Sequence, residues 1–429
     1  MSQPAPTPRH DPFAALRHRD FALFILSRTI ASMGGQMVAV AVGWQIYAIT
    51  HQAFALGMMG MVQAVPAITL ALWAGHVADR HDRRRILLGT ESILILTSLG
   101  LVAVTSWRLP YYWIYAVLFF RGLAGGMQGP SQAALMPQLT PGADFPNAVT
   151  WRTTLFQVAA VVGPALGGVL LAHRRNPADV YAAEAVIGVL SLTAMTFMAS
   201  RPVEPHDPEE PVLQSILGGI RFVRRQKAVL GAMALDLFAV LFGGAVALLP
   251  VFARDILHVG PVGLGILRAA SSAGGMLTAI ALLRRPPLRR SGPLLLAVVA
   301  AFGLTMIGFG LSRWFWLSMV FLAISGAVDN VSMVIRGTVV QAMTPNAMRG
   351  RVSAVNGVFI GASNELGAFE SGVAAKYLGT VPSVVLGGTM TLVVVALAAL
   401  SWPELRRLGR LDQLQIPVDD PSQEAVPPF

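Results

Sequence analysis

The sequence predicts an all-α membrane protein with twelve transmembrane helices, arranged in two six-helix, pseudo-symmetric halves. Three observations lead to this fold class. The chain is 54% hydrophobic and only 13% charged, and its mean hydropathy of +0.61 is too high for a soluble globular protein. It contains about twelve apolar runs, each near the roughly 20 residues that cross a bilayer. The second half of the chain also looks like a copy of the first.

Each apolar run is expected to be a helix, because a backbone exposed to lipid must satisfy its own hydrogen bonds. The run 21–47 is too long for a signal peptide and lacks a small-residue cleavage site, so residues 1–20 are expected to remain as a tail. The other runs lie near 53–76, 86–106, 111–136, 147–171, 179–200, 228–252, 261–283, 292–312, 314–340, 351–375 and 381–402.

The halves 21–200 and 228–402 are expected to run parallel, because six spans separate equivalent positions. A shift of 204 residues aligns Thr140 with Thr344, Pro141 with Pro345, Gly122 with Gly326, Gly163 with Gly367, Arg80 with Arg284 and Arg85 with Arg289. The linker 201–227 begins rich in Pro and acids and ends amphipathic, which predicts a helix on the cytoplasmic surface; a plain tether is the alternative. Within the C-terminal tail 403–429, the polar stretch 412–429 is expected to be disordered.

The net charge of +10 is interpreted as membrane topology. Of the 32 Lys and Arg residues, 21 lie on the side of the termini, 6 on the opposite side and 5 within spans. Cationic loops stay inside, so both termini are expected in the cytoplasm, and nucleic-acid binding is not expected. The absence of cysteine excludes disulfides and thiol chemistry.

The loop GHVADRHDRRRILL, Gly75 to Leu88, concentrates charge between two apolar runs. Topology alone explains its arginines. It does not explain Asp79, because an unpaired carboxylate at the mouth of a membrane helix is costly. Such an acid is favoured where a helix N-terminus or an arginine of another helix faces it.

This loop resembles the Gly-x-x-x-Asp-Arg-x-Gly-x-Arg-Arg signature of the major facilitator superfamily. The matching residues are Gly75, Asp79, Arg80, Arg84 and Arg85. Asp82 replaces the second glycine, as is frequent in the siderophore-exporter branch of that superfamily. The resemblance implies a loop that latches the two halves together when the cytoplasmic side is closed.

Three further stretches extend the resemblance over nearly the whole chain. Arg121 and Gly125 resemble the span 4 signature, in which an arginine serves proton transfer, although Ala124 replaces the usual glutamine. The stretch Thr344–Gly357 is similar to the 10–11 loop of the exporter branch. GPALGG in span 5 resembles a signature of export by antiport that usually has a glycine at the position of Ala159, and close helix packing is its alternative role. Its residues are Gly163, Pro164, Gly167 and Gly168.

Ionisable residues within spans are rare and costly, which makes them candidates for function. Helical spacing gathers a polar stripe on span 4 (Arg121, Gly125, Gln128 and Gln132) and another on span 10 (Asp329, Ser332 and Arg336). The 204-residue shift superposes the two, so both are expected to line a central cavity. The same shift aligns Ser32, near Arg28, with Asp236. The candidates for proton coupling or the substrate cavity are Arg28, Arg121, Gln128, Asp236, Asp329, Arg336 and Glu365. For Arg152, Glu184 and Arg268 a structural ion pair or a snorkelling side chain is expected.

The sequence lacks a Walker-type phosphate loop and catalytic signatures such as His-Glu-x-x-His. Its histidines lie in tails or near span ends, so no enzyme, cofactor or metal site is expected. The sequence therefore predicts a secondary transporter of the bacterial inner membrane that exports a small organic molecule, such as a siderophore, against proton entry. A drug or macrolide efflux carrier and a non-transporting receptor of the same fold remain alternatives. No oligomer is required.

Overall fold

The computed structural model describes residues 11–140, 142–200, 212–284, 290–345 and 348–409, and every regular element in these ranges is helical. Residues 1–10 of the predicted N-terminal tail and the stretch 412–429, which is expected to be disordered, lie outside these ranges. Just before the first helix the chain is hydrogen-bonded to the rest of the protein. The Pro12 carbonyl accepts 2.9 Å hydrogen bonds from the side chains of Asn147 and Trp151. The first half contains α1 (Arg19–Thr50), α2 (Ala53–Arg80), α3 (Arg83–Ser106), α4 (Tyr112–Leu139), α5 (Phe145–Arg174) and α6 (Pro177–Thr196).

A helix occupies the end of the linker. This helix, α7 (Val212–Arg225), packs against the start of α13, where Val223 is buried with Val352 and Val355. The second half then contains α8 (Lys227–Gly243), α9 (Leu249–Val251), α10 (Gly260–Leu283), α11 (Ser291–Leu311), α12 (Phe315–Ala342), α13 (Arg349–Leu378), α14 (Thr380–Ser401) and α15 (Pro403–Arg406).

The seventh span is interrupted, whereas the sequence predicts one continuous helix over 228–252. After α8 come a 3₁₀ turn, the short α9 and a π-helix over Phe252–Ile256. The adjacent Gly243 and Gly244 weaken the helix, and Pro250 lacks the backbone N–H that would continue it. The carbonyl of Gly244 instead accepts a 3.1 Å hydrogen bond from the Ser371 hydroxyl of α13.

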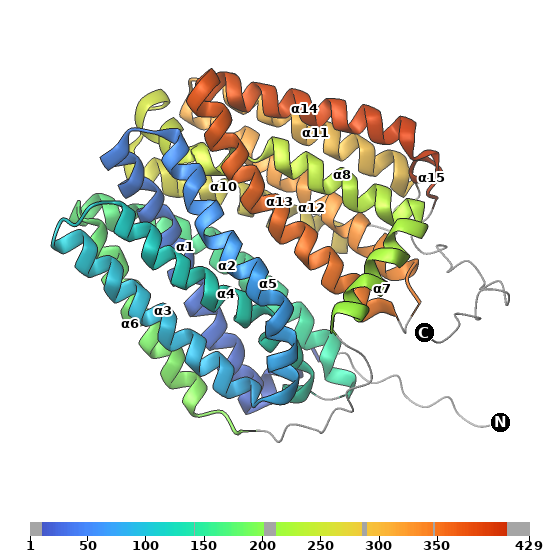
Figure 1. The fold of residues 1–429 in the computed structure, drawn as a ribbon, viewed down its shortest axis with the longest axis horizontal. Helices are drawn as coiled ribbons and strands as arrows, with labels where there is room; N and C mark the ends of the chain where they lie inside the picture. The colour runs from blue at the N-terminus through green and yellow to red at the C-terminus, as the bar shows by residue number, and fades with distance from the viewer. Residues whose placement is uncertain (1–10, 141, 201–211, 285–289, 346–347, 410–429) are drawn as a thin grey trace.

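The two halves repeat the same pattern of helix contacts. In the first half α1 packs on α5 and α6, α2 on α4, and α3 on α4 and α6. In the second half α8 packs on α13 and α14, α10 on α12, and α11 on α12 and α14. The halves lie side by side and meet where α2 runs along α13 and α5 along α10 (Figure 1). This arrangement is the pseudo-two-fold relationship that the 204-residue shift predicts.

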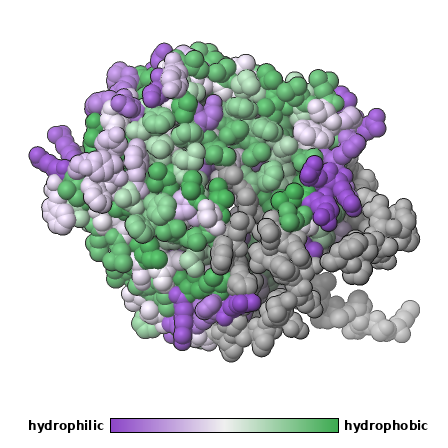
Figure 2. Space-filling model, viewed as in Figure 1, coloured by the Kyte–Doolittle hydropathy of each residue, from purple (hydrophilic) through white to green (hydrophobic). Residues whose placement is uncertain are grey.

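Ten helical stretches in the described ranges are long and apolar enough to cross a membrane. Hydrophobic residues dominate the visible surface, and hydrophilic residues gather near its edges (Figure 2). The two remaining long helices, α4 and α13, have 28 and 30 residues but fall outside this set. They contain polar residues such as Gln128 and Glu365, which lower their hydropathy. The count of twelve spans therefore stays a prediction.

Glycines allow the two halves to touch. An added Cβ at Gly168 of α5 would lie 2.5 Å from the carbonyl oxygen of Pro261 and 3.1 Å from the Cα of Gly265, both in α10. At the equivalent crossing, a Cβ at Gly57 of α2 would lie 3.0 Å from the Cα of Gly372 in α13. Only residues without a side chain permit such close backbone approach.

Both crossings lie toward the end of the bundle opposite the start of α1, here called the distal end. Two apolar clusters join the halves there: Val251 packs in a first-half cluster, and Val40 packs in a second-half cluster. Near the start of α1, each buried cluster draws its residues from one half only. The structure is therefore closed at the distal end, and its described apolar clusters do not bridge the halves at the end that holds the chain termini.

Candidate functional site: charges inside the helical bundle

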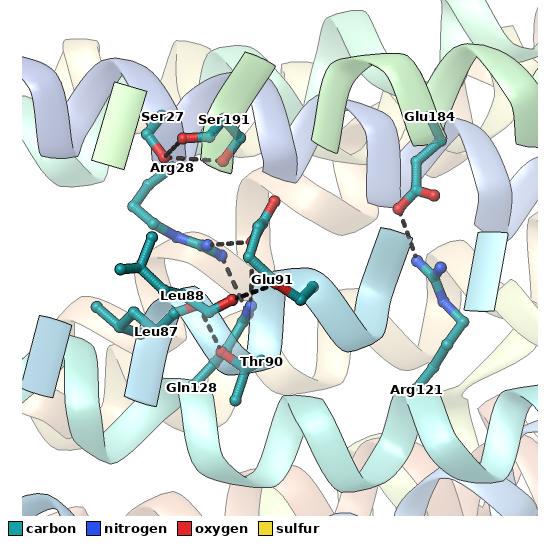
Figure 3. Close-up of polar contacts among 11 residues, drawn as sticks. Ser27, Arg28, Leu87, Leu88, Thr90, Glu91, Arg121, Gln128, Glu184 and Ser191 are labelled. Atoms are coloured by element: carbon teal, nitrogen blue, oxygen red, sulfur yellow. Dashed lines mark hydrogen bonds and ion pairs between the residues drawn. The ribbon is translucent and has the colours of Figure 1, made fainter. Parts of the chain in front are cut away.

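Arg28 of α1 is held inside the first half by α3 and α4. Its guanidinium lies 3.0 Å from the Glu91 carboxylate and donates a 3.0 Å hydrogen bond to the Gln128 side chain (Figure 3). When the Gln132 side-chain amide is turned so that its oxygen faces Arg28, it accepts two further hydrogen bonds at 3.3 Å from the guanidinium. The side chain of Glu91 is 2% exposed and that of Arg28 is 14% exposed. The polar stripe of span 4 thus contacts α1 and α3.

Arg121 of α4, the charged residue of this stripe, is also bound within the first half. It forms a 3.1 Å ion pair with Glu184 of α6 (Figure 3). It also donates hydrogen bonds to Thr97 and Ser98 of α3. Its side chain is 10% exposed. Since a carboxylate and two hydroxyls occupy its donors, little of the guanidinium is free to meet a substrate. The structural ion pair expected for Glu184 is present.

The two ion pairs occupy matching positions. In each pair the arginine is on the first helix and the glutamate on the third helix of a three-helix unit, α1–α3 or α4–α6, and 63 residues separate the partners in both. Three-helix repeats nested within each six-helix half are known in transporters of this architecture. The same charged bridge therefore joins the outer members of both units.

In the second half, Asp236 of α8 forms an ion pair with Arg336 of α12. The side chains are 9% and 12% exposed, and the Arg336 Nε atom has no hydrogen-bond partner among the described atoms. This link joins the first and fourth spans of the second half, as the contact between Arg28 and Gln132 joins those of the first. The arginine lies on the first span (α1) in the first half and on the fourth span (α12) in the second half.

Asp329 differs from the other buried charges. It lies midway along α12, its side chain is exposed, and within the described residues it has no ion pair or hydrogen bond. Protein atoms nevertheless surround it densely. Exposure combined with dense surroundings is expected for a side chain on the wall of an internal cavity.

Glu365 of α13 lies where the two halves meet. Its carboxylate oxygen would be 2.9 Å from a Cβ added at Gly60 of α2, and it interacts electrostatically with Arg268 of α10. This interaction lies next to the crossing of α2 with α13, and an ion pair at Arg268 stays a prediction. Glu370, five residues further along α13, is also partly buried.

The described part of the charged loop is bound to the first half. Arg84 donates hydrogen bonds to the carbonyls of Met195 and Thr196, at 3.1 and 2.6 Å, at the end of α6. Asp82 is the N-cap of α3, accepting a 2.9 Å hydrogen bond from the Arg84 backbone, which explains an acid at this position. Arg85 lies 3.7 Å from Asp82, and Arg80 is exposed. The side chain of Asp79 and the surroundings of Gly75 lie outside the described part.

The antiport-like stretch of α5 is packed on both sides. A Cβ at Gly163 would lie 2.8 Å from the Met33 carbonyl oxygen, and one at Gly167 would lie 2.8 Å from the Cα of Met37, both in α1. On the other side Gly168 and the carbonyl of Pro164 meet α10. The stretch therefore fixes α5 against its own half and against the other half at once.

A contact between the halves escaped prediction: the Tyr47 hydroxyl of α1 donates a hydrogen bond to Asp255 in the π-helix. Little in the sequence indicates this contact, because Asp255 lies between two apolar runs, in a stretch predicted to be an external loop. Within the described residues, no group of three or more His, Asp or Glu side chains could hold a metal ion.

Comparisons with known proteins agree with this geometry. A family model described as transmembrane secretion effector matches residues 10–422. The chain is 26% identical over 389 residues to proteins named enterobactin exporter EntS from Shigella boydii and Escherichia coli, covering 89% of this chain and 93% of each relative.

Solved structures show the same fold at low identity. A POT family transporter in complex with 5-aminolevulinic acid matches with a TM-score of 0.71 and 12% identity, over 90% of this chain and 96% of that one. A D-xylose–proton symporter matches with a TM-score of 0.68 and 14% identity, over 89% and 99%. The chain belongs to the transmembrane secretion effector family of the major facilitator superfamily.

Proposed function

We propose that this chain is a proton-coupled secondary transporter that exports a small organic molecule, such as a siderophore, across the bacterial inner membrane. Two halves that touch through glycine crossings at one end can rock about a central site, which gives alternating access. The observation that supports proton coupling best is Asp329, an accessible carboxylate deep among protein atoms with no partner in the described part. The relatives named as enterobactin exporters support a siderophore as substrate.

The three candidate carboxylates differ in how freely they can exchange a proton. Asp236 is held by Arg336 and is little exposed, which suits a structural role. Asp329 is exposed and unpaired in the described part of the chain. Glu365 lies against α2, so its surroundings must change when α2 and α13 separate. We therefore assign proton exchange to Asp329 and Glu365, and we assign Arg28, Gln128 and Arg121 to the framework of the first half.

Proteoliposomes loaded with enterobactin, the siderophore in the names of those relatives, test this assignment. Net flux under an imposed pH gradient is compared with exchange at equal pH for Asp329→Asn and Glu365→Gln. At least one variant should lose proton-driven flux and retain exchange, because exchange needs the rocking motion but no net protonation. Glu370→Gln on the same helix is the matched control and should behave as wild type. Wild-type flux in both Asp329→Asn and Glu365→Gln would refute the assignment.

The same vesicles separate the alternatives. A drug or macrolide carrier would transport a macrolide under the same gradient and leave the siderophore behind. A receptor of the same fold would bind the siderophore and move neither compound. Export by antiport, as the glycines of α5 suggest, requires protons to move opposite to the siderophore, which a pH-sensitive dye inside the vesicles reports.

The orientation is proposed from the distribution of cations. With 21 Lys and Arg on the side of the termini and 6 opposite, both termini belong in the cytoplasm. The distal end is then periplasmic, and the structure is the form closed to the periplasm. Reporter fusions after Asp82, Pro205 and Gln415 should all report the cytoplasm; a periplasmic signal from any of them would contradict the orientation.

A further inference from the structure

A groove with a volume of about 500 Å³ lies at the distal end, between α1, α5, α6 and α10. Its walls are mainly apolar. Arg175, directly after α5, is the charged residue among those that line it. The apolar side chains come from all four helices: Trp44, Ile49, Leu171, Pro177 and Pro261.

Cations are scarce at the distal end. The Arg175 side chain is one of them, and it has no hydrogen bond or ion pair in the described part of the chain. Two of the other distal cations have neighbours: Arg254 lies 4.0 Å from Asp255, and the Lys376 ammonium lies 4.8 Å from the centre of the Phe54 ring. Arg108 is exposed like Arg175, but it does not line the groove. The positive-inside rule disfavours cations on this side of the membrane. An unpaired arginine here, beside an apolar groove, is therefore placed to bind an anion from outside the protein.

The groove lies at the level of the membrane interface. Large aromatic residues are exposed at the same end of the bundle, in the connections between α3 and α4 and between α11 and α12: Trp107, Tyr112, Trp113, Trp314 and Trp316. Tryptophan and tyrosine collect at the depth of lipid headgroups. A groove at this depth is therefore supplied with lipid from the surrounding leaflet.

We propose that this groove binds an anionic phospholipid, with its phosphate next to Arg175 and an acyl chain against Trp44, Ile49 and Leu171. An arginine guanidinium can bind two phosphate oxygens at once through its planar set of N–H donors. The apolar walls accept the acyl chain, and the exposed guanidinium supplies the charge that selects an anionic over a zwitterionic lipid.

The lipid binds the distal-closed form. Pro261 belongs to the second half and lies next to the crossing of Gly168 with Gly265, whereas the rest of the lining belongs to the first half. When the halves separate at this end, the groove loses that wall. A ligand that prefers one of two states shifts the population toward it, so the anionic lipid favours closure of the distal end.

Native mass spectrometry of the whole protein, released from bilayers of phosphatidylethanolamine with or without phosphatidylglycerol, tests the site. Arg175→Gln and Ala172→Trp, which fills the groove, should both retain less of the phosphatidylglycerol adduct, and Arg175→Gln should weaken its binding about fivefold. Arg108→Gln is the matched control: Arg108 is also exposed, distal and in the left-handed region (φ 53° against 55° for Arg175), but it does not line the groove. The thermal unfolding midpoint in phosphatidylethanolamine checks that each variant is folded.

The outcomes decide the proposal. Loss of the adduct in Arg175→Gln and Ala172→Trp but not in Arg108→Gln supports it. Equal loss in all three variants would show general attraction to distal cations, and no loss in any of them would show that lipid binds elsewhere; both overturn it. Equal retention of phosphatidylethanolamine and phosphatidylglycerol by the wild-type protein would overturn the anionic selectivity.

Discussion

Replacing Gly168 by alanine should open the distal end. The added Cβ would lie 2.5 Å from the Pro261 carbonyl oxygen, against 3.4 Å or more for ordinary contact, so α5 and α10 must separate by about 0.9 Å. Overpacking of this kind costs about 1–3 kcal/mol. The cost falls mainly on the distal-closed form, where the two helices cross, so the ratio of closed to open forms should fall about 5- to 150-fold.

The protein has no cysteine, so labels can be placed uniquely. Spin labels at Gln52→Cys and Val262→Cys, in opposite halves at the distal end, report the opening by electron–electron distance measurement. In Gly168→Ala the distance distribution should shift toward longer values. Gly89→Ala is the control, because nothing lies within 4 Å of its Cβ position. A folded Gly168→Ala protein with the wild-type distribution would show that this crossing does not set the state.

Three further perturbations test separate parts of the structure. Tyr47→Phe removes the hydrogen bond to Asp255, which should destabilise the distal-closed form by about 0.5–1.5 kcal/mol. The same spin-label distances should therefore shift in the same direction but by less, and no shift would show that this contact has no role in closure. Glu184→Gln leaves Arg121 buried beside a neutral partner and should lower the free energy of unfolding in detergent by about 3–5 kcal/mol. The double change Arg121→Met with Glu184→Leu should recover most of this stability. Failure of that recovery would indicate that the pair has a role beyond packing. Asp79→Asn should impair transport at normal abundance, and unchanged transport would reduce the charged loop to a topology signal.

Much of the fold follows from local properties of the sequence. Apolar runs, the 204-residue repeat and the small residues of α5 predict helices, their pairing and a close approach, because each depends on residue type and spacing alone. The break in the seventh span was equally readable in Gly243, Gly244 and Pro250, but helix breakers in membrane spans are often tolerated. Their effect depended on α13 offering the Ser371 hydroxyl to the freed carbonyl.

Helical spacing identifies a polar face, but it cannot say which neighbour that face meets. The span 4 stripe was expected to line the central cavity because it superposes on the stripe of span 10. In the structure its charged member pairs with Glu184 and its glutamine with Arg28. These partners come from helices distant in the chain, and only tertiary packing brings them within hydrogen-bonding reach. Whether any of these side chains meets substrate in another state stays a prediction.

Buried charged residues have different surroundings in the two halves. In the first half Arg28 and Arg121 are each neutralised by a glutamate of the same half, so rocking of the halves breaks neither pair. In the second half Asp329 is open, and Glu365 lies against a helix of the other half. Only a carboxylate whose surroundings differ between the two states can link proton binding to their interconversion. Under the proposed mechanism, the first half is therefore the rigid frame, and the second half holds the carboxylates that respond to the movement.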